Sequence, residues 1–205
     1  MEDNAALVAP RADEVPDSAL LVAFSNGDAR AGRQLAARLG PMLFGYAARV
    51  LGDHGEAEDV VQETMLRLWK MAPNWRQGEA RVTTWAYRVT MNLCTDRLRQ
   101  RRVRPQVALD SIAEPAADLA SAVELMTARQ RSETLDAALS VLPDRQRQAV
   151  VMRHLEGFSN PEIAEVMDIG VEAVESLTAR GKRALKKALY GKREELGFED
   201  DRKQP

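Results

Sequence analysis

Flat aromatic and cationic side chains gather between residues 75 and 104. Unpaired bases stack on flat rings and a nucleic-acid backbone needs positive charge, so this composition favours binding of single-stranded nucleic acid. The side chains concerned are Trp75, Arg76, Arg81, Trp85, Tyr87, Arg88, Asn92, Arg97, Arg99, Arg101, Arg102 and Arg104. Among them, Asn92 supplies an amide that can hydrogen-bond a base edge. Trp85 falls on an apolar stripe, so packing in the core is the alternative to nucleic-acid binding for that residue.

A second cationic group lies near the C-terminal end. The apolar spacing predicts a helix from Asn160, a turn at Asp168-Ile169-Gly170 and a helix over Val171–Leu189, which is the arrangement of a helix-turn-helix. Asp168 stands where Gly is usual, but Asp tolerates left-handed backbone. Base edges would meet the outward residues of the second helix, which are Glu172, Ala173, Glu175, Ser176, Ala179 and Arg180. Phosphates would meet the cations that follow, which are Lys182, Arg183, Lys186 and Lys187. The alternative is a solvated charged face.

An acidic and amide face stands opposite the apolar stripe of a third predicted helix, over Glu56–Met71. Its members are Glu58, Asp59, Gln62 and Glu63. From the residues alone, this face is either a solvated surface or a binding surface. A di-iron site is not predicted, because neither His54 nor His154 has a Glu three residues before it. We expect no metal and no cofactor.

Helical periodicity runs through most of the chain, without strand alternation or repeats, and predicts an all-α fold. Ser18 is expected to cap a helix over Ala19–Ser25, and Gly27-Asp28 to separate that helix from the next. Gly40-Pro41 is expected to break the next stretch into Ala29–Leu39 and Met42–Leu51. The other predicted helices are Glu56–Met71, a helix from Val82 through Arg102, one from near Ala122 and one from Pro143.

The pattern divides the chain into two small helical domains joined by an extended linker. The helical periodicity lapses from Val103 to about Ser121, where Pro105 and Pro115 suggest an extended segment. The predicted divisions are a mobile leader at 1–16, a first helical domain at 17–102, the linker at 103–122, a second domain with the helix-turn-helix at 123–191 and a charged tail at 192–205.

Composition narrows the function classes. The 29 basic and 31 acidic residues give a net charge of −2 over 205 residues, which is unusual for a nucleic-acid binder, but the cations are concentrated in the two groups above. No apolar run reaches the roughly 20 residues that span a bilayer, and the first residues are acidic where an export signal is basic. We therefore expect a cytoplasmic protein without membrane insertion. Cys94 is the only cysteine, so no internal disulfide can form, and a buried, inert thiol is expected.

Three stretches resemble bacterial sigma factors of the extracytoplasmic-function (ECF) group. Ala57–Thr64, continuing to Leu68-Trp69-Lys70, is similar to that family's polymerase-docking helix. Thr84–Val89 with Asn92 is similar to its promoter-melting helix, and the motifs between Leu142 and Ser176 are similar to its minus-thirty-five-reading domain. These motifs stand in the family's order and spacing. They are far more specific than a single helix-turn-helix.

The resemblance implies a transcription initiation factor and assigns roles to the three groups. The residues that would bind the β′ subunit of the RNA polymerase core, which also contains the β subunit, are Glu58, Asp59, Gln62 and Glu63. The residues that would contact the minus-ten strand are Trp75, Arg76, Gly78, Glu79, Arg81, Tyr87, Arg88, Asn92, Arg99, Arg101 and Arg102. The residues that would contact the minus-thirty-five element are Arg153, Glu172, Ala173, Glu175, Ser176, Ala179, Arg180, Lys182 and Arg183. The family further implies a role in a stress response and control by an anti-sigma factor.

Two other function classes are alternatives. An ordinary regulator would join a sensing or dimerising domain to the helix-turn-helix and would bind duplex DNA unaided, which a gel shift with the protein alone would detect. Against it stands the aromatic and arginine surface, which a sensor does not need. An enzyme is not expected, because the sequence has no phosphate-binding glycine loop, metal cluster or recognisable nucleophile and base. Val82, Ala86, Glu172 and Glu175 depart from the residues common in the ECF group, so the promoter sequence is not predicted.

Overall fold

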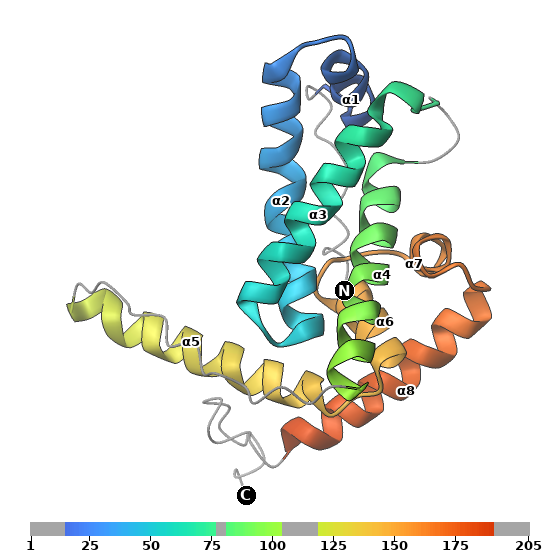
Figure 1. Cartoon of the computed structure of the whole chain (residues 1–205). Coiled ribbons are helices and arrows are strands. Elements are labelled where there is room, and N and C mark those ends of the chain that lie inside the picture. The colour runs from blue at the N-terminus through green and yellow to red at the C-terminus, as the bar shows by residue number, and fades with distance from the viewer. Residues whose placement is uncertain (1–14, 77–80, 104–118, 191–205) are drawn as a thin grey trace, which may run out of the picture.

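The computed structural model describes residues 15–76, 81–103 and 119–190, with the backbone alone for residues 119–129. All regular structure in these ranges is helical (Figure 1), as the sequence predicts. The helices are α1 (Asp17–Ser25), α2 (Ala29–Leu51), α3 (His54–Met71), the short 3-10 helix η1 (Ala72–Asn74), α4 (Val82–Val103), α5 (Leu119–Ser140), α6 (Asp144–His154), α7 (Asn160–Met167) and α8 (Val171–Tyr190).

The boundaries of α1 and α2 follow local capping chemistry. Gly27 has φ of +97°, and the Asp28 side chain accepts hydrogen bonds from the backbone N–H groups of Arg30 and Ala31, which satisfies donors left free at a helix start. The prediction that Ser18 caps α1 is wrong. The helix begins at Asp17, two residues before the predicted start, and its N-cap is Pro16, whose side chain cannot accept a capping bond.

The predicted break at Gly40-Pro41 is also wrong, since α2 runs without interruption from Ala29 to Leu51 with Pro41 inside it. An interior proline removes one backbone hydrogen bond and costs about 3 kcal/mol. Leu39 before it and Leu43 and Tyr46 after it are all fully or almost fully buried, and α2 packs on both α3 and α4. Continuing the buried stripe therefore outweighs the local penalty.

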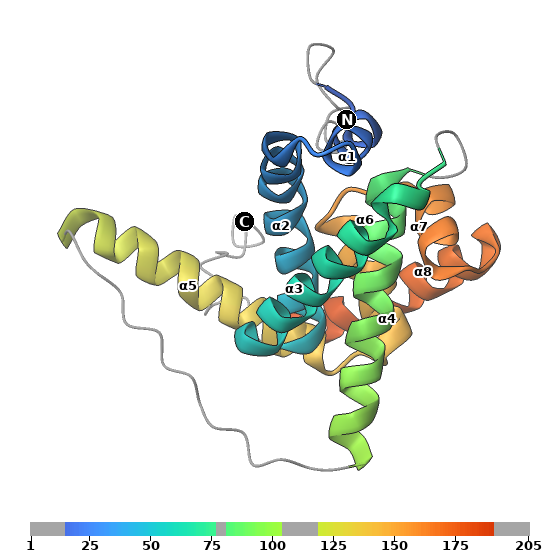
Figure 2. The ribbon, with the colours of Figure 1, turned by 45° about the horizontal axis from the view of Figure 1, so that its top comes forward.

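The predicted linker at 103–122 is helical at both of its ends, since Val103 ends α4 and residues 119–122 begin α5. Helix α5 begins at Leu119, slightly before the predicted start near Ala122, and the remainder of that linker, 104–118, lies outside the described residues. The predicted leader at 1–16 is described only at its last two residues, and the tail lies outside the described range. In both views the beginning of α5 extends away from the other helices (Figures 1 and 2).

The predicted helix-turn-helix is formed by α7 and α8. A capping box starts α7, in which the Ser159 and Glu162 side chains each bond the other's backbone N–H. Asp168 ends the helix in left-handed backbone, with φ of +52°, and thus fills the turn position as expected. Ile163, Ala164 and Met167 are buried, which confirms the inward face predicted for α7.

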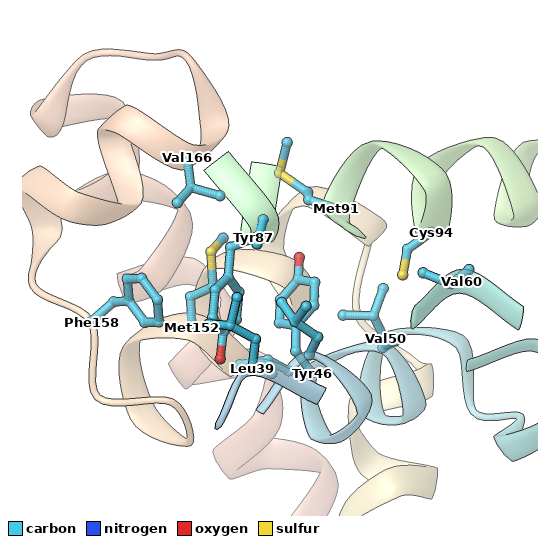
Figure 3. Close-up of a cluster of buried hydrophobic side chains, with 14 of the residues drawn as sticks. Leu39, Tyr46, Val50, Val60, Tyr87, Met91, Cys94, Met152, Phe158 and Val166 are labelled. Atoms are coloured by element: carbon cyan, nitrogen blue, oxygen red, sulfur yellow. The ribbon is translucent and has the colours of Figure 1, made fainter. Parts of the chain in front are cut away.

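The two helical halves, α1–α4 and α5–α8, share one core. Tyr46 of α2, Tyr87 of α4 and Phe158, which follows α6, form a row of edge-on aromatic rings, with centroids 5.5 Å and 4.6 Å apart. Figure 3 shows these rings beside Met152 and Val166 of the second half. The apolar cluster is therefore continuous from α1 to α8, and the sequence did not predict that the halves pack together.

The crossing of α6 and α8 depends on Gly181, and this gives a stability prediction. A Cβ at Gly181 would lie 2.5 Å from Val150 Cγ2 and 3.2 Å from the Gln146 carbonyl oxygen. Gly181→Ala is expected to lower the free energy of unfolding by about 1–3 kcal/mol, because overpacking outweighs the higher helix propensity of alanine. Urea unfolding of the full chain measures this. The control is Gly55→Ala in α3, where the added carbon would meet only Asp53 Oδ1 at an ordinary 3.5 Å and a gain of about 0.5–1 kcal/mol is expected. Equal effects of the two substitutions would contradict the packing account.

Candidate functional site

The acidic face of α3 is exposed as its sequence pattern indicates. Glu58, Asp59 and Gln62 are exposed and Glu63 is half-buried, so all four can be reached by a partner. Two carboxylates have cationic neighbours: Arg67 Nε donates to Glu63 Oε1 at 2.8 Å, and Arg97 lies 3.8 Å from Asp59. The hydrogen bond from Arg67 lowers the pKa of the Glu63 carboxyl, which therefore stays charged well below neutral pH.

Leu66 belongs to the same face, and sequence reasoning missed it. Its side chain is 52% exposed, although leucine is usually buried. It follows Gln62 and Glu63 by four and three residues, which places it beside them on the helix surface. The signal was in the sequence: an apolar residue outside the stripe of Ala57, Val60 and Leu68. A leucine inside a polar rim is the composition of a protein-binding surface, whose centre is apolar.

The predicted minus-ten residues fall into different environments around α4. Arg88, Asn92, Arg99 and Arg102 are exposed, as are Arg76 and Arg81 at the two edges of the preceding loop, while Trp75 and Trp85 are half-buried. Gly78 and Glu79 lie outside the described residues. The exposed members provide a cationic surface along α4.

Tyr87 differs from this group because it is fully buried. Its ring packs between Tyr46 and Phe158, and its hydroxyl donates to Glu156 Oε2 at 2.8 Å. Burial, and then the neighbouring Glu156 carboxylate, raise the pKa of the Tyr87 hydroxyl, so it remains a donor. In this arrangement Tyr87 cannot stack on a base, and Trp85, half-buried instead of fully buried, is the more accessible ring.

Arg101 is engaged within the first half of the chain. Its guanidinium donates to Glu56 Oε1 at 3.0 Å and to the Leu51 carbonyl at 2.8 Å, and it lies 3.3 Å from Asp53. It thereby joins the end of α2, the start of α3 and the end of α4. The arginine run thus supplies an arginine held within the first half beside exposed ones such as Arg99 and Arg102, which charge counting along the sequence does not separate.

The outward face of α8 is open. The residues Glu172, Ala173, Glu175, Ala179, Arg180, Lys182 and Arg183 are exposed, and Ser176 is half-buried. Val174 and Thr178 on the opposite side are buried, so the helix turns its apolar side to the core and its polar side outward, as predicted. Arg153 is also exposed, and its guanidinium donates to the Phe158 carbonyl at 2.9 Å, which holds the chain before α7.

Cys94 matches the expectation of a buried, inert thiol. Its side chain is fully buried, and burial, with a smaller effect of Glu56, raises the pKa of the thiol to about 12. Among the residues that the structure describes, no group of three or more His, Cys, Asp or Glu side chains is arranged to hold a metal ion. In the same ranges, no helix combines the length and apolar character that crossing a membrane requires.

An open helix-turn-helix face beside a cationic helix is typical of a DNA-binding protein, and the acidic face of α3 is a third exposed surface. Comparisons with known proteins agree. Residues 35–104 match the sigma-70 region 2 family and residues 132–185 match sigma-70 region 4. The chain belongs to the ECF group of RNA polymerase sigma factors. Sigma factors are transcription initiation factors and not enzymes.

Full-length relatives cover both halves. The chain is 33% identical over 176 residues to the ECF RNA polymerase sigma factor SigM of Mycobacterium tuberculosis, covering 86% of each chain. It is 31% identical to the RNA polymerase sigma-H factor of Pseudomonas aeruginosa, covering 84% of this chain and 93% of that one. Among solved structures it resembles CnrH in complex with the cytosolic domain of CnrY, with a TM-score of 0.63, 27% identity and coverage of 85% of this chain and 97% of that one.

A second solved structure shares the fold. It is the sigma factor RpoE in complex with the anti-sigma factor NepR from Bartonella quintana, with a TM-score of 0.60 and 23% identity, covering 77% of this chain and 96% of that one.

Proposed function

We propose that this sigma factor binds the core polymerase through the acidic face of α3 and reads promoter DNA with α4 and α8. The observation that carries this proposal is the separation of three exposed surfaces of different chemistry on three helices. One chain can then contact the polymerase and two DNA elements without competition among the surfaces. Two weak DNA contacts mounted on one polymerase gain from effective concentration, which is consistent with a net charge of only −2.

Each surface takes the partner that its chemistry suits. Glu58, Asp59, Gln62 and Glu63 bind the β′ coiled coil, and the exposed Leu66 provides an apolar centre. The half-buried tryptophans and exposed arginines around α4 bind the minus-ten strand. The outward residues of α8 bind the minus-thirty-five element, with Arg180 contacting bases and Lys182 and Arg183 contacting phosphates. The two domains remain those predicted, but the linker is shortened to residues 104–118, between the end of α4 and the start of α5.

Regulation by an anti-sigma factor in a stress response is part of the proposal. CnrH is solved with the cytosolic domain of CnrY, and RpoE with the anti-sigma factor NepR. By analogy, an inhibitor holds this chain away from the polymerase in the cytoplasm until a signal releases it.

Transcription with purified components tests the proposed function. Core polymerase is combined with fragmented genomic DNA, with and without this protein, and new transcripts are mapped to their start sites. We expect a small set of promoters that share two sequence elements and respond only when the protein is present. If no transcript depends on the protein although it binds duplex DNA alone, an ordinary regulator is the better description.

Arg180 gives a prediction for the reading helix. Its side chain is exposed on α8, and Arg180→Ala is expected to weaken promoter-specific transcription by about 1–3 kcal/mol, the value of one good base contact. Run-off transcription from the mapped promoter and from versions substituted at each position of the upstream element measures this loss and its position dependence. A uniform response to every substitution, unchanged by Arg180→Ala, would contradict the assignment.

A further inference from the structure

An acidic edge of the second half meets the cationic surface of α4. We define this acidic edge as Asp144, Glu156, Glu162 and the backbone carbonyl of Glu165. Arg81 donates to Glu162 Oε1 at 2.7 Å, and Arg102 donates to Asp144 Oδ2 at 2.8 Å. Arg88 donates to the Glu165 carbonyl. Three of the exposed cations proposed to contact the minus-ten strand therefore have oxygen partners on α6 and α7.

The centre of this contact is better shielded from water than its rim. The Glu156 side chain is 11% exposed and accepts the hydroxyl of the fully buried Tyr87, and Arg49 lies 4.0 Å away. At the rim, Arg81 is 60% exposed and Arg102 is 70% exposed. Exposed ion pairs contribute little to stability, because water screens them. The hydrogen bond to the shielded carboxylate is therefore the stronger part of the contact.

We propose that the acidic edge is an intramolecular substitute for the DNA backbone, which engages Arg81, Arg88 and Arg102 at the cationic surface of α4 until the two halves separate. Carboxylate and carbonyl oxygens occupy the positions at which Arg81, Arg88 and Arg102 would otherwise bind phosphate oxygens. The same arginines cannot bind both partners, so closure of the chain and binding of a single strand compete. The competition between closure and strand binding rests on the proposed function, because it takes α4 as the surface that binds the strand. The closure itself does not depend on the proposed function.

Closure of the chain can be measured without DNA. Cysteines replace the exposed Gln34 of α2 and Tyr190 at the end of α8 and carry a donor and an acceptor dye. Cys94 does not interfere, because its thiol is buried and its pKa is raised to about 12, and the thiolate is the reactive form. Single-molecule energy transfer then reports the ratio of open to closed chains in the full-length protein.

The test variant is Glu156→Gln with Glu162→Gln, which removes two charges and keeps the side-chain shapes. Glutamine also serves at the third position of a capping box, so α7 keeps its start. We expect the ratio of open to closed chains to rise about tenfold, the value of a hydrogen bond to a charged group. The control is Glu165→Gln, which removes an exposed charge nearby but leaves the backbone carbonyl that binds Arg88. The control is expected to stay closed.

A second measurement needs no substitution at the acidic edge. Raising NaCl from ~0.05 M to ~0.5 M screens exposed charges, so the otherwise unchanged labelled protein is expected to open, and the double variant to respond less. An unchanged energy transfer, in the double variant and with salt alike, would overturn the closure. Circular dichroism of each variant confirms that an opened chain is still helical.

Binding of a labelled pool of single-stranded DNA of random sequence then tests whether the acidic edge takes the place of DNA on the cationic surface. The double variant is expected to bind about tenfold more tightly than the parent, in proportion to its larger open fraction, and Glu165→Gln to bind as the parent does. If the double variant opens but binds the strand no better, the acidic edge is not a DNA substitute, and this part of the proposal fails. Such a failure is distinct from failure of the proposed function, which shows as the absence of protein-dependent transcripts.

Discussion

Asp59→Arg is expected to abolish binding of the core polymerase and leave the chain folded. Asp59 is exposed on α3, and its nearest cation, Arg97, lies at 3.8 Å, so the native side chain contributes little to stability. Within a protein interface, a like-charge pair costs several kcal/mol. We expect at least a roughly 100-fold weaker affinity, since each 1.4 kcal/mol is a factor of ten. Biolayer interferometry with immobilised core polymerase measures it.

The matched control for this charge reversal is Asp96→Arg. Asp96 is an exposed acid of α4 in the same half of the chain, and it is not part of the α3 face. The control is expected to bind core polymerase within about twofold of the parent, the scale of a surface substitution. Equal binding by the parent and Asp59→Arg would remove α3 from the docking role. Equal loss in both variants would indicate a general charge effect.

The second large effect is expected from Arg147→Met, because Arg147 joins the two halves from a buried position. Its guanidinium donates to the Val50 carbonyl at 2.6 Å, to the Ser140 carbonyl at 2.7 Å and to the Leu142 carbonyl at 3.2 Å. Val50 and Ser140 lie at the ends of α2 and α5, where carbonyl oxygens lack helical partners and favour a cation. Methionine fills the space but leaves these oxygens without a donor. We expect the free energy of unfolding to fall by about 3–5 kcal/mol.

Thermal and urea unfolding of the full chain measures this loss, with Arg145→Met as the control. Arg145 lies on the same helix, but it is exposed and makes a single long bond of 3.4 Å to the Met167 carbonyl. Its replacement is expected to cost less than about 1 kcal/mol. A small loss at Arg147 would contradict this account and mean that the other contacts between the halves are sufficient to hold them together.

Local chemistry made much of the fold predictable. Asp28 and Ser159 start their helices as side-chain caps, and Asp168 accepts the left-handed turn, because such effects depend on a few neighbouring residues. The apolar stripes of α3 and α7 likewise point to the core. The exposed residues of α8 follow directly from that periodicity, so this proposed reading face was the most predictable surface.

Effects of distant packing were not predictable. Pro41 reads locally as a helix break, yet burial on both sides of it keeps α2 continuous. Tyr87 reads as a base-stacking ring, but the second half covers it. Arg101 looks like its neighbours in the sequence and is held by Glu56 from 45 positions earlier. In each case the deciding partner is remote in sequence, and periodicity carries no information about it.

The outward face of α8 stays uncovered, whereas Arg81, Arg88 and Arg102 are paired. If these surfaces have the proposed roles, the difference sets an expected order of events on DNA. Nonspecific attraction to a duplex depends on free lysines and arginines, and Lys182, Arg183 and Lys186 are exposed in the closed chain. Scanning of a double helix thus needs no prior rearrangement, whereas strand separation does. The slow step of promoter engagement would then fall after the first encounter, and its rate would be sensitive to the opening of the chain and not to the concentration of sites.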